Sequence, residues 1–411
     1  MKKLLIFSVL LFCTNHIFAQ HFSDFFCDRT LRIDYIFAGN QNLQNIYVDE
    51  LFSIPRWYGK RQHLAEVPLR GSGQIIVRTA ETQQIIYRNS FSTLFQEWLA
   101  TDEARQTQKS FENVFLVPYP KQPIDVTIEL YDYHNHTNAS MTHRVDPKDI
   151  LIRKADSIDT MPYKTLQQAS DTSRCIHIAF VAEGYQADEM PRFIDACRVA
   201  MESLFAHEPF KHLKSRFNIV AVESPAVDSG ASEPGSGLWR NTVLGSHFDT
   251  FYSNRYLTTL HLKRLHDVLA GTPYEHIIVL VNTDRYGGGG IYNSYNLTYV
   301  NGTQFRPVVV HEFGHSFGGL ADEYPYGDDD PMYFADTEPW EPNLTTKCDF
   351  NGKWENLIQE GKAGFIEGGG CLAKGVWRGF ENCRMRTNEE PEFCLVCQQW
   401  LERLINFYTQ P

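Results

Sequence analysis

Apolar and polar residues alternate between about residues 30 and 145, a pattern typical of half-buried β-strands. The clearest runs are Leu31, Ile33, Tyr35, Phe37 and Ile124, Val126, Ile128, Leu130. Between them, GQIIVRT and QQIIYRN predict a hairpin. We therefore expect an antiparallel β-sandwich over residues 20–146, and we interpret it as an accessory domain without candidate site residues.

The pattern changes after a polar stretch over residues 147–171, which we interpret as a linker. Strands are expected at CIHIAFVAEG, FNIVAVES and HIIVLVNTD, and helices at ADEMPRFIDACRVAMESLF and LTTLHLKRLHDVL. Strands alternating with helices predict a mixed α/β domain over residues 172–411, with a largely buried sheet. The fold class is thus α+β or mixed α/β, with the sandwich preceding this domain.

A glycine-rich segment, RYGGGGIYNSYNLTYVN, follows the third of these strands. It has neither a Lys-Ser/Thr pair after the glycines nor a GxGxxG spacing, so it does not indicate a nucleotide site. We interpret it as a flexible hinge that leads into an exposed edge strand. The free backbone groups of such a strand can hold an extended peptide.

The charge and the first residues indicate the compartment and the partners. The 411 residues carry a net charge of −12, which argues against binding to nucleic acids or anionic membranes. Residues 1–19 contain two lysines, an apolar run from Leu4 to Cys13 and a small residue, Ala19, which together indicate a signal peptide. The apolar run is too short to span a bilayer. We expect an exported protein that is periplasmic, on the cell surface or secreted.

Removal of this signal peptide leaves eight of the nine cysteines, and an even number in an exported chain suggests disulfides. Five of them occur near the C-terminus: Cys348, Cys371, Cys383, Cys394 and Cys397. We expect a disulfide-stapled C-terminal segment with little regular structure. Cys394-x-x-Cys397 is also compatible with half a zinc ribbon or a redox pair, but no second CxxC supports either interpretation.

The stretch RPVVVHEFGHSFGGLADEY carries the candidate chemistry. Its apolar positions predict a helix with one buried stripe: Val309, Phe313, Phe317 and Leu320. His311 and His315 then lie one turn apart, so both imidazoles can bind one zinc ion, and Glu312 can act on a water without being a ligand. Gly318-Gly319 can end the helix, after which Asp322 or Glu323 supplies a third ligand.

HEFGHSFGGLADEY resembles the zinc-binding signature of the IgA-peptidase family of bacterial metallopeptidases, family sixty-four in the usual peptidase classification. VAEGYQADEMPRF, FNIVAVESPAVDSG and EPNLTTKCDFNGKWENLI are also similar to segments of that family. The resemblance implies a metzincin-like catalytic domain. Metzincins have glycine seven and a ligand ten residues after the first histidine; this chain has Gly318 at seven but Ala321 at ten. The third-ligand role therefore passes to Asp322, with Glu323 as the alternative.

The resemblance also implies that Cys383-Arg-Met385 is the turn that places a methionine beneath the metal, where Met385 would form an apolar floor. Zinc would activate a water, Glu312 would act as general base, and Tyr324 is the candidate stabiliser of the oxyanion. A calcium ion at Asp328, Asp329 and Asp330 is a weaker expectation.

We therefore expect a secreted zinc metalloendopeptidase that hydrolyses a protein or glycoprotein substrate. The alternatives are an exported protein- or glycan-binding protein with a structural or inactive zinc site, and a metal-dependent hydrolase acting on another kind of bond. An intact Glu312 favours the peptidase, because a structural zinc site needs no general base.

Overall fold

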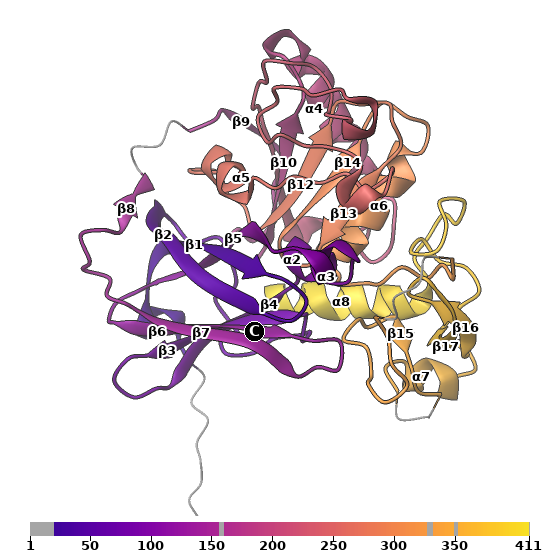
Figure 1. Cartoon of the computed structure of the whole chain (residues 1–411), viewed down its shortest axis with the longest axis horizontal. Helices are drawn as coiled ribbons and strands as arrows, with labels where there is room; N and C mark the ends of the chain where they lie inside the picture. Colours follow the sequence, from indigo (N-terminus) through magenta and orange to yellow (C-terminus); the bar gives the residue numbers. More distant parts are fainter. Residues whose placement is uncertain (1–19, 156–159, 327–331, 349–351, 411) are drawn as a thin grey trace, which may run out of the picture.

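The computed structural model describes residues 20–155, 160–326, 332–348 and 352–410. Figure 1 shows a β-rich N-terminal part packed beside a mixed α/β part, with the last helix lying against both. The predicted signal peptide and the acidic loop of Asp328–Asp330 lie outside the described residues. Within the described ranges, no helix is long and apolar enough to cross a bilayer.

The N-terminal part is built from two four-stranded sheets. One has the order β5-β1-β2-β8 and the other β4-β3-β6-β7, and all their neighbours pair antiparallel except β2 and β8. The strands are β1 (Phe26–Gly39), β2 (Gln44–Pro55), β3 (Gly73–Thr79), β4 (Ile85–Phe91), β5 (Lys109–Pro120), β6 (Ile124–Tyr131), β7 (Thr137–Val145) and β8 (Arg153–Lys154). Three short helices accompany them: α1 (Phe22–Phe25), α2 (Leu94–Trp98) and α3 (Glu103–Gln106).

The alternating residues of the sequence face the core between these two sheets. The side chains of Leu31, Ile33, Tyr35 and Phe37 in β1 are fully buried, as are those of Val126, Ile128 and Leu130 in β6. They belong to one hydrophobic cluster, to which β3 contributes Ile75 and Val77. The predicted hairpin is formed by β3 and β4. The apolar face of each sheet thus covers that of the other.

The second part is organised around a six-stranded sheet of order β13-β14-β12-β10-β11-β9. Its strands are β9 (Tyr163–Gln167), β10 (Ile176–Glu183), β11 (Phe217–Val222), β12 (His276–Val281), β13 (Gly288–Ile291) and β14 (Tyr295–Tyr299). The four central strands are parallel, and the two edge strands, β9 and β13, are antiparallel to their neighbours. The predicted α+β class, with a β-rich antiparallel N-terminal region, is confirmed.

Helices cover both faces of this sheet, which is why its strands are apolar throughout. In β10, Ile178 and Phe180 face a cluster that includes α4 (Met190–Leu204), α6 (Phe305–Ser316) and α8 (Leu395–Thr409). Ala179 and Val181 face the other way, into a cluster shared with α5 (Leu262–Val268) and the sandwich. One continuous core therefore joins the sandwich to the sheet.

The glycine-rich segment differs from the expectation. The glycine run is itself the edge strand β13, and the segment after it, β14, is an interior strand whose residues are all buried. The stretch interpreted as a linker also carries strands, since β8 pairs with β2 and β9 pairs with β11. Of the predicted helix over residues 257–269, only α5 is helical.

The C-terminal segment has more regular structure than its cysteines suggested. It contains a three-stranded sheet of β15 (Leu344–Thr345), β17 (Leu372–Arg378) and β16 (Ile366–Gly369), and also α7 (Glu355–Gln359) and α8. The expectation of little regular structure was wrong chiefly at α8. This helix buries an apolar stripe of Val396, Cys397, Leu401, Leu404 and Ile405. Cys383, Cys394 and Cys397 are free thiols, so the disulfide expectation gains no support from them.

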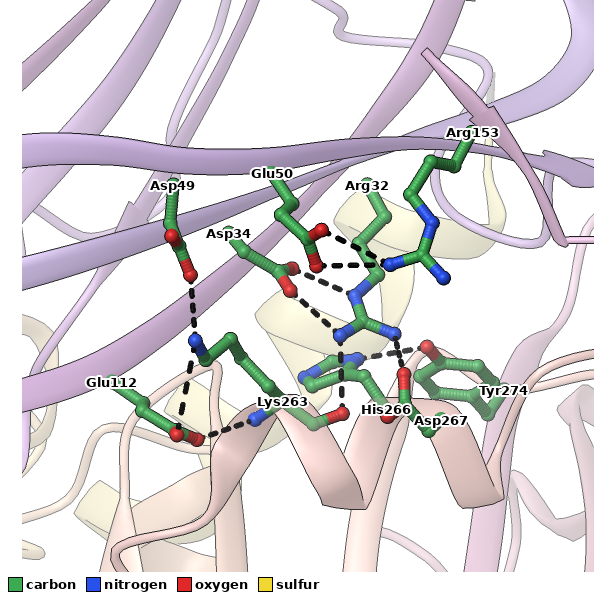
Figure 2. A network of polar contacts seen from close by, with 10 residues as sticks. All are labelled: Arg32, Asp34, Asp49, Glu50, Glu112, Arg153, Lys263, His266, Asp267 and Tyr274. Carbon is green, nitrogen blue, oxygen red and sulfur yellow. Dashed lines mark hydrogen bonds and ion pairs between the residues drawn. The ribbon is translucent and has the colours of Figure 1, made fainter. Parts of the chain in front are cut away.

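A polar network connects the sandwich to α5 (Figure 2). Arg32 and Asp34 project from β1 on the side opposite the sandwich core and are 1% and 0% exposed. The Arg32 guanidinium donates to both carboxylate oxygens of Asp34, at 2.7 and 2.8 Å, to Asp267 at 2.7 Å and to the carbonyl of Lys263 at 3.0 Å. The buried charge is therefore fully paired across the junction between the two parts.

The substitution Asp34→Ala tests this network. It would leave the Arg32 guanidinium buried without its bidentate partner, so we expect the free energy of unfolding to fall by about 3–5 kcal/mol. The matched control is Arg153→Ala, which breaks the exposed Arg153–Glu50 pair and should cost less than about 1 kcal/mol. Equal effects of the two substitutions in urea denaturation would contradict the assigned role of Asp34.

Candidate metal centre

Helix α6 positions the two histidines of the HEFGH motif. Pro307 lies in its first turn, and the predicted stripe of Val309, Phe313 and Phe317 is buried. After Ser316 the chain turns at Gly319, whose φ of 60° is a conformation that favours glycine. The Gly319 N–H donates to the carbonyl of His315 at 2.9 Å. The chain then doubles back, bringing residues 320–324 alongside the helix.

Both imidazole rings are oriented by backbone carbonyls. His311 Nδ1 lies 3.1 Å from the carbonyl of Arg384, and His315 Nδ1 lies 2.6 Å from the carbonyl of Leu320. A carbonyl only accepts hydrogen bonds, so each Nδ1 carries a hydrogen and each Nε2 is left to bind a metal ion or, without one, a proton. The two Nε2 atoms lie 3.0 Å apart.

Asp322 completes a cluster of three acceptor groups. Its Oδ1 lies 3.0 Å from His311 Nε2 and 3.3 Å from His315 Nε2. This oxygen has no well-formed hydrogen bond although it is buried. Acceptors that converge on one point fit a cation at that point, and two imidazoles with one carboxylate form a typical zinc donor set. The three side chains are 16%, 16% and 23% exposed, so the cluster is open on one side.

The charges around the cluster also favour a cation. Burial opposes a charge on His315, but the Asp322 carboxylate outweighs this effect and raises the pKa of His315 to about 9. Burial would raise the pKa of Asp322, yet His315 and His311 hold it well below its ordinary range. Burial raises the pKa of Glu312, which keeps its carboxylate basic.

The glycines of β13 allow this strand to pass directly over the motif. A Cβ atom at Gly288 would lie 2.4 Å from Glu312 Oε1. At Gly290 it would lie 2.6 Å from the carbonyl oxygen of Glu312 and 2.9 Å from the Cβ of His315. The Glu312 carboxylate therefore lies against the edge strand.

The edge of β13 is partly occupied by the chain itself. The Gly288 N–H donates to the carbonyl of Arg255, and the Gly288 carbonyl accepts from the N–H of Leu257. The Tyr256 ring packs so close to Gly289 that a Cβ there would lie 2.5 Å from it. The exposed edge expected from the sequence is thus covered at its first residues.

Tyr324 contacts the cluster directly, whereas Met385 packs against the motif helix. The Tyr324 hydroxyl donates to Asp322 Oδ2 at 2.8 Å, so in this structure it orients the carboxylate. Met385 is fully buried, and a Cβ at Gly314 would lie 2.6 Å from its Sδ. Met385 therefore packs under the helix between the two histidines, which accounts for the glycine within the motif.

Glu323, the alternative third ligand, points away from the histidines. Its side chain is 1% exposed, and its Oε1 accepts from Asn343 Nδ2 at 2.9 Å. Of the two carboxylates that the sequence offered, the structure brings only Asp322 to the histidine pair. Asp322 and Glu323 are adjacent in the sequence but lie in two different environments.

The sandwich contributes one residue that the sequence did not indicate. Glu97, in α2, accepts a hydrogen bond from the Tyr256 hydroxyl. Burial raises the pKa of Glu97 to about 7, and the charges of His315, Asp322 and Glu312 also act on it. A glutamate in FQEWLA gives no local signal, because its position near the site depends on how the two parts pack.

Comparison with models of known protein families assigns the chain to a family. The family described as IgA Peptidase M64 matches residues 165–363, and the module described as Peptidase M64 N-terminus matches residues 21–142. The chain belongs to this peptidase family. No curated protein matches it. Family membership makes the protein a peptidase and its substrate a protein, and the HEFGH helix lies within the matched M64 region.

The substitution Gly290→Ala tests the close approach of β13 to α6. The added methyl would meet the helix backbone, so we expect overpacking to lower the free energy of unfolding by about 1–3 kcal/mol and to weaken metal binding. Gly364→Ala is the control, because no atom lies within 4 Å of its added Cβ. If thermal denaturation and metal titration do not distinguish the two variants, the proposed contact is wrong.

Proposed function

We propose that this M64 peptidase is an exported zinc metalloendopeptidase whose metal is held by His311, His315 and Asp322. The observation that carries the proposal is the convergence of their Nε2 and Oδ1 atoms within 3.0–3.3 Å on a partly exposed point. Three protein ligands leave a fourth position open for water or substrate, as in catalytic zinc sites. The signal-peptide pattern of residues 1–19 supports export.

Zinc at this point would supply Lewis acidity that polarises the scissile carbonyl and acidifies the attacking water. The chain's own residues would transfer the proton and hold the ligands in position. Glu312, one position from His311 and not a ligand, would accept a proton from the water and pass it to the leaving amine. Its buried surroundings favour this role, since they raise its pKa. Tyr324 would hold Asp322 in place through the hydrogen bond to Oδ2.

The substrate would approach over β13. A peptide in an extended conformation can pair with an edge strand, and the Glu312 carboxylate lies against this one. Because the segment from Arg255 to Leu257 already pairs with Gly288, the substrate would use the remaining edge or displace that segment. Glu97 and Tyr256 would then form part of the wall of the site.

The variant Glu312→Gln separates catalysis from metal binding. It removes the base but no ligand, so we expect peptide hydrolysis to fall by at least about 100-fold while the zinc content stays unchanged. Hydrolysis of an unfolded protein such as casein, measured with and without a chelator, gives the first value and elemental analysis the second. Loss of zinc from this variant would contradict the role of Glu312.

Asp322→Asn is the matched ligand variant. It keeps the shape of the side chain but removes the negative charge, so we expect weaker zinc binding and a loss of activity that added zinc partly restores. Unchanged zinc affinity would exclude Asp322 as a ligand.

Tyr324→Phe distinguishes two roles for the hydroxyl. If Tyr324 orients Asp322, we expect about 10–100-fold weaker zinc affinity, with kcat close to normal at saturating zinc. If it stabilises the oxyanion, kcat should fall at saturating zinc by a factor of about 100 or more. A variant with unchanged affinity and unchanged kcat would contradict both roles.

A further inference from the structure

Three thiols and one carboxylate meet in the core behind residues 320–324, the loop that carries Asp322 and is called the ligand loop below. Glu323, Cys383, Cys394 and Cys397 each offer one ligand atom, and these atoms all lie within 4.8 Å of one another. All four side chains are buried: Glu323 is 1% exposed, Cys383 and Cys397 are 0% and Cys394 is 8%. The helix α8 begins at this cluster, with Cys394 as its N-cap.

The distances within the cluster are those of metal ligands. Cys397 Sγ lies 3.7 Å from Cys383 Sγ and 3.6 Å from Cys394 Sγ, whereas a disulfide has an S–S distance of about 2.0 Å. Tetrahedral zinc with Zn–S bonds of about 2.3 Å places its sulfurs about 3.8 Å apart. Glu323 Oε1 lies 3.3 Å from Cys397 Sγ, close to the roughly 3.5 Å expected between an oxygen and a sulfur ligand.

The Glu323 carboxylate gives an independent indication of a cation. Its Oε2 is buried and has no hydrogen-bond partner. A carboxylate oxygen left bare in the core is costly unless a metal ion or a proton satisfies it. A disulfide would not satisfy it, and a disulfide between any two of the three thiols would leave the third unpaired beside the carboxylate.

Two features at the start of α8 suit sulfurs that are bound to a metal. The Cys394 N–H donates to Cys383 Sγ at 3.2 Å. The N-terminus of α8 adds the positive end of a helix dipole next to Cys394 and Cys397. Both features would stabilise the thiolate form in which cysteine binds a metal.

We propose that Glu323, Cys383, Cys394 and Cys397 form a second metal site, structural in role and suited to a soft divalent cation such as zinc. Four buried protein ligands fill a tetrahedral shell and leave no position for water. The site is therefore closed, in contrast to the open cluster of His311, His315 and Asp322. Its existence does not depend on the proposed function.

The second site would fix the first through the backbone. Glu323 follows Asp322 directly, and its N–H donates to the carbonyl of Met385 at 2.8 Å. Cys383 precedes Arg384, whose carbonyl accepts from His311 Nδ1. A metal that joins Glu323 to Cys383 would thus fix the distance between the ligand loop and the Arg384 carbonyl that orients His311.

Metal content and cobalt spectra test the proposal. We expect two zinc ions per chain of the purified protein and one in the double variant His311→Ala, His315→Ala. After cobalt exchange, that variant should keep the thiolate-to-cobalt charge-transfer absorption, because all three thiols remain. The double variant Cys383→Ser, Cys397→Ser should lose the absorption and one zinc. Cys197→Ser, which changes a buried cysteine elsewhere, should lose neither.

Measurements on the unaltered protein keep the test valid if the cysteine variants do not fold. Intact mass and disulfide mapping should find Cys383, Cys394 and Cys397 reduced, and removal of metal should expose them to alkylation. A disulfide between any two of them would overturn the second site and leave the first intact. The same conclusion would follow if the His311→Ala, His315→Ala variant held no zinc and showed no charge-transfer absorption after cobalt exchange. A Cys383→Ser, Cys397→Ser variant that holds as much zinc as the unaltered protein would overturn the proposal as well.

Two zinc ions retained in His311→Ala, His315→Ala would count against the first site instead.

Discussion

The hydrogen bond from His311 to the carbonyl of Arg384 connects three segments that must keep fixed positions for a site to exist. Arg384 lies in the turn beneath α6, and the next residue, Met385, packs its sulfur against Gly314 and accepts the N–H of Glu323 through its carbonyl. The motif helix, the ligand loop and the C-terminal segment therefore share one small turn. A side chain at Gly314 would separate them, which explains why the helix carries glycine in its interior despite the cost to helix stability.

The sandwich is part of the same construction because it shares a hydrophobic core with the central sheet. The Arg32 network adds direction to this contact. Asp34 orients the guanidinium within β1, and the guanidinium can then donate to Asp267 and to the Lys263 carbonyl in only one relative placement of β1 and α5. With that placement set, α2 brings Glu97 to the Tyr256 hydroxyl beside the edge strand. The N-terminal module thus contacts the surroundings of the proposed site through Glu97, a residue that the sequence interpretation did not single out.

Local patterns account for what the sequence could predict. The alternation in β1 and the helical stripe of α6 each depend on neighbours within a few residues, and Asp322 follows the helix closely enough for its return to be foreseen. Arg32 and Asp34 show where such reasoning ends: they occupy the polar face of an alternating strand, yet α5 buries them. The cysteine cluster could not be predicted for the same reason: Glu323 and Cys397 are 74 residues apart in the sequence, so no local pattern connects them.

Asp322 and Glu323 show how one turn can serve two chemical environments. Successive side chains of the loop after α6 enter different surroundings. Asp322 faces the partly exposed histidines, where a bound metal would have an open coordination position for a reactant. Glu323 faces a closed pocket of thiols, where a metal can only hold the chain together. The peptide bond between them makes the two environments mechanically dependent, since any shift of the buried carboxylate displaces the exposed one. The stability of the thiol cluster would then set how precisely the open site is held.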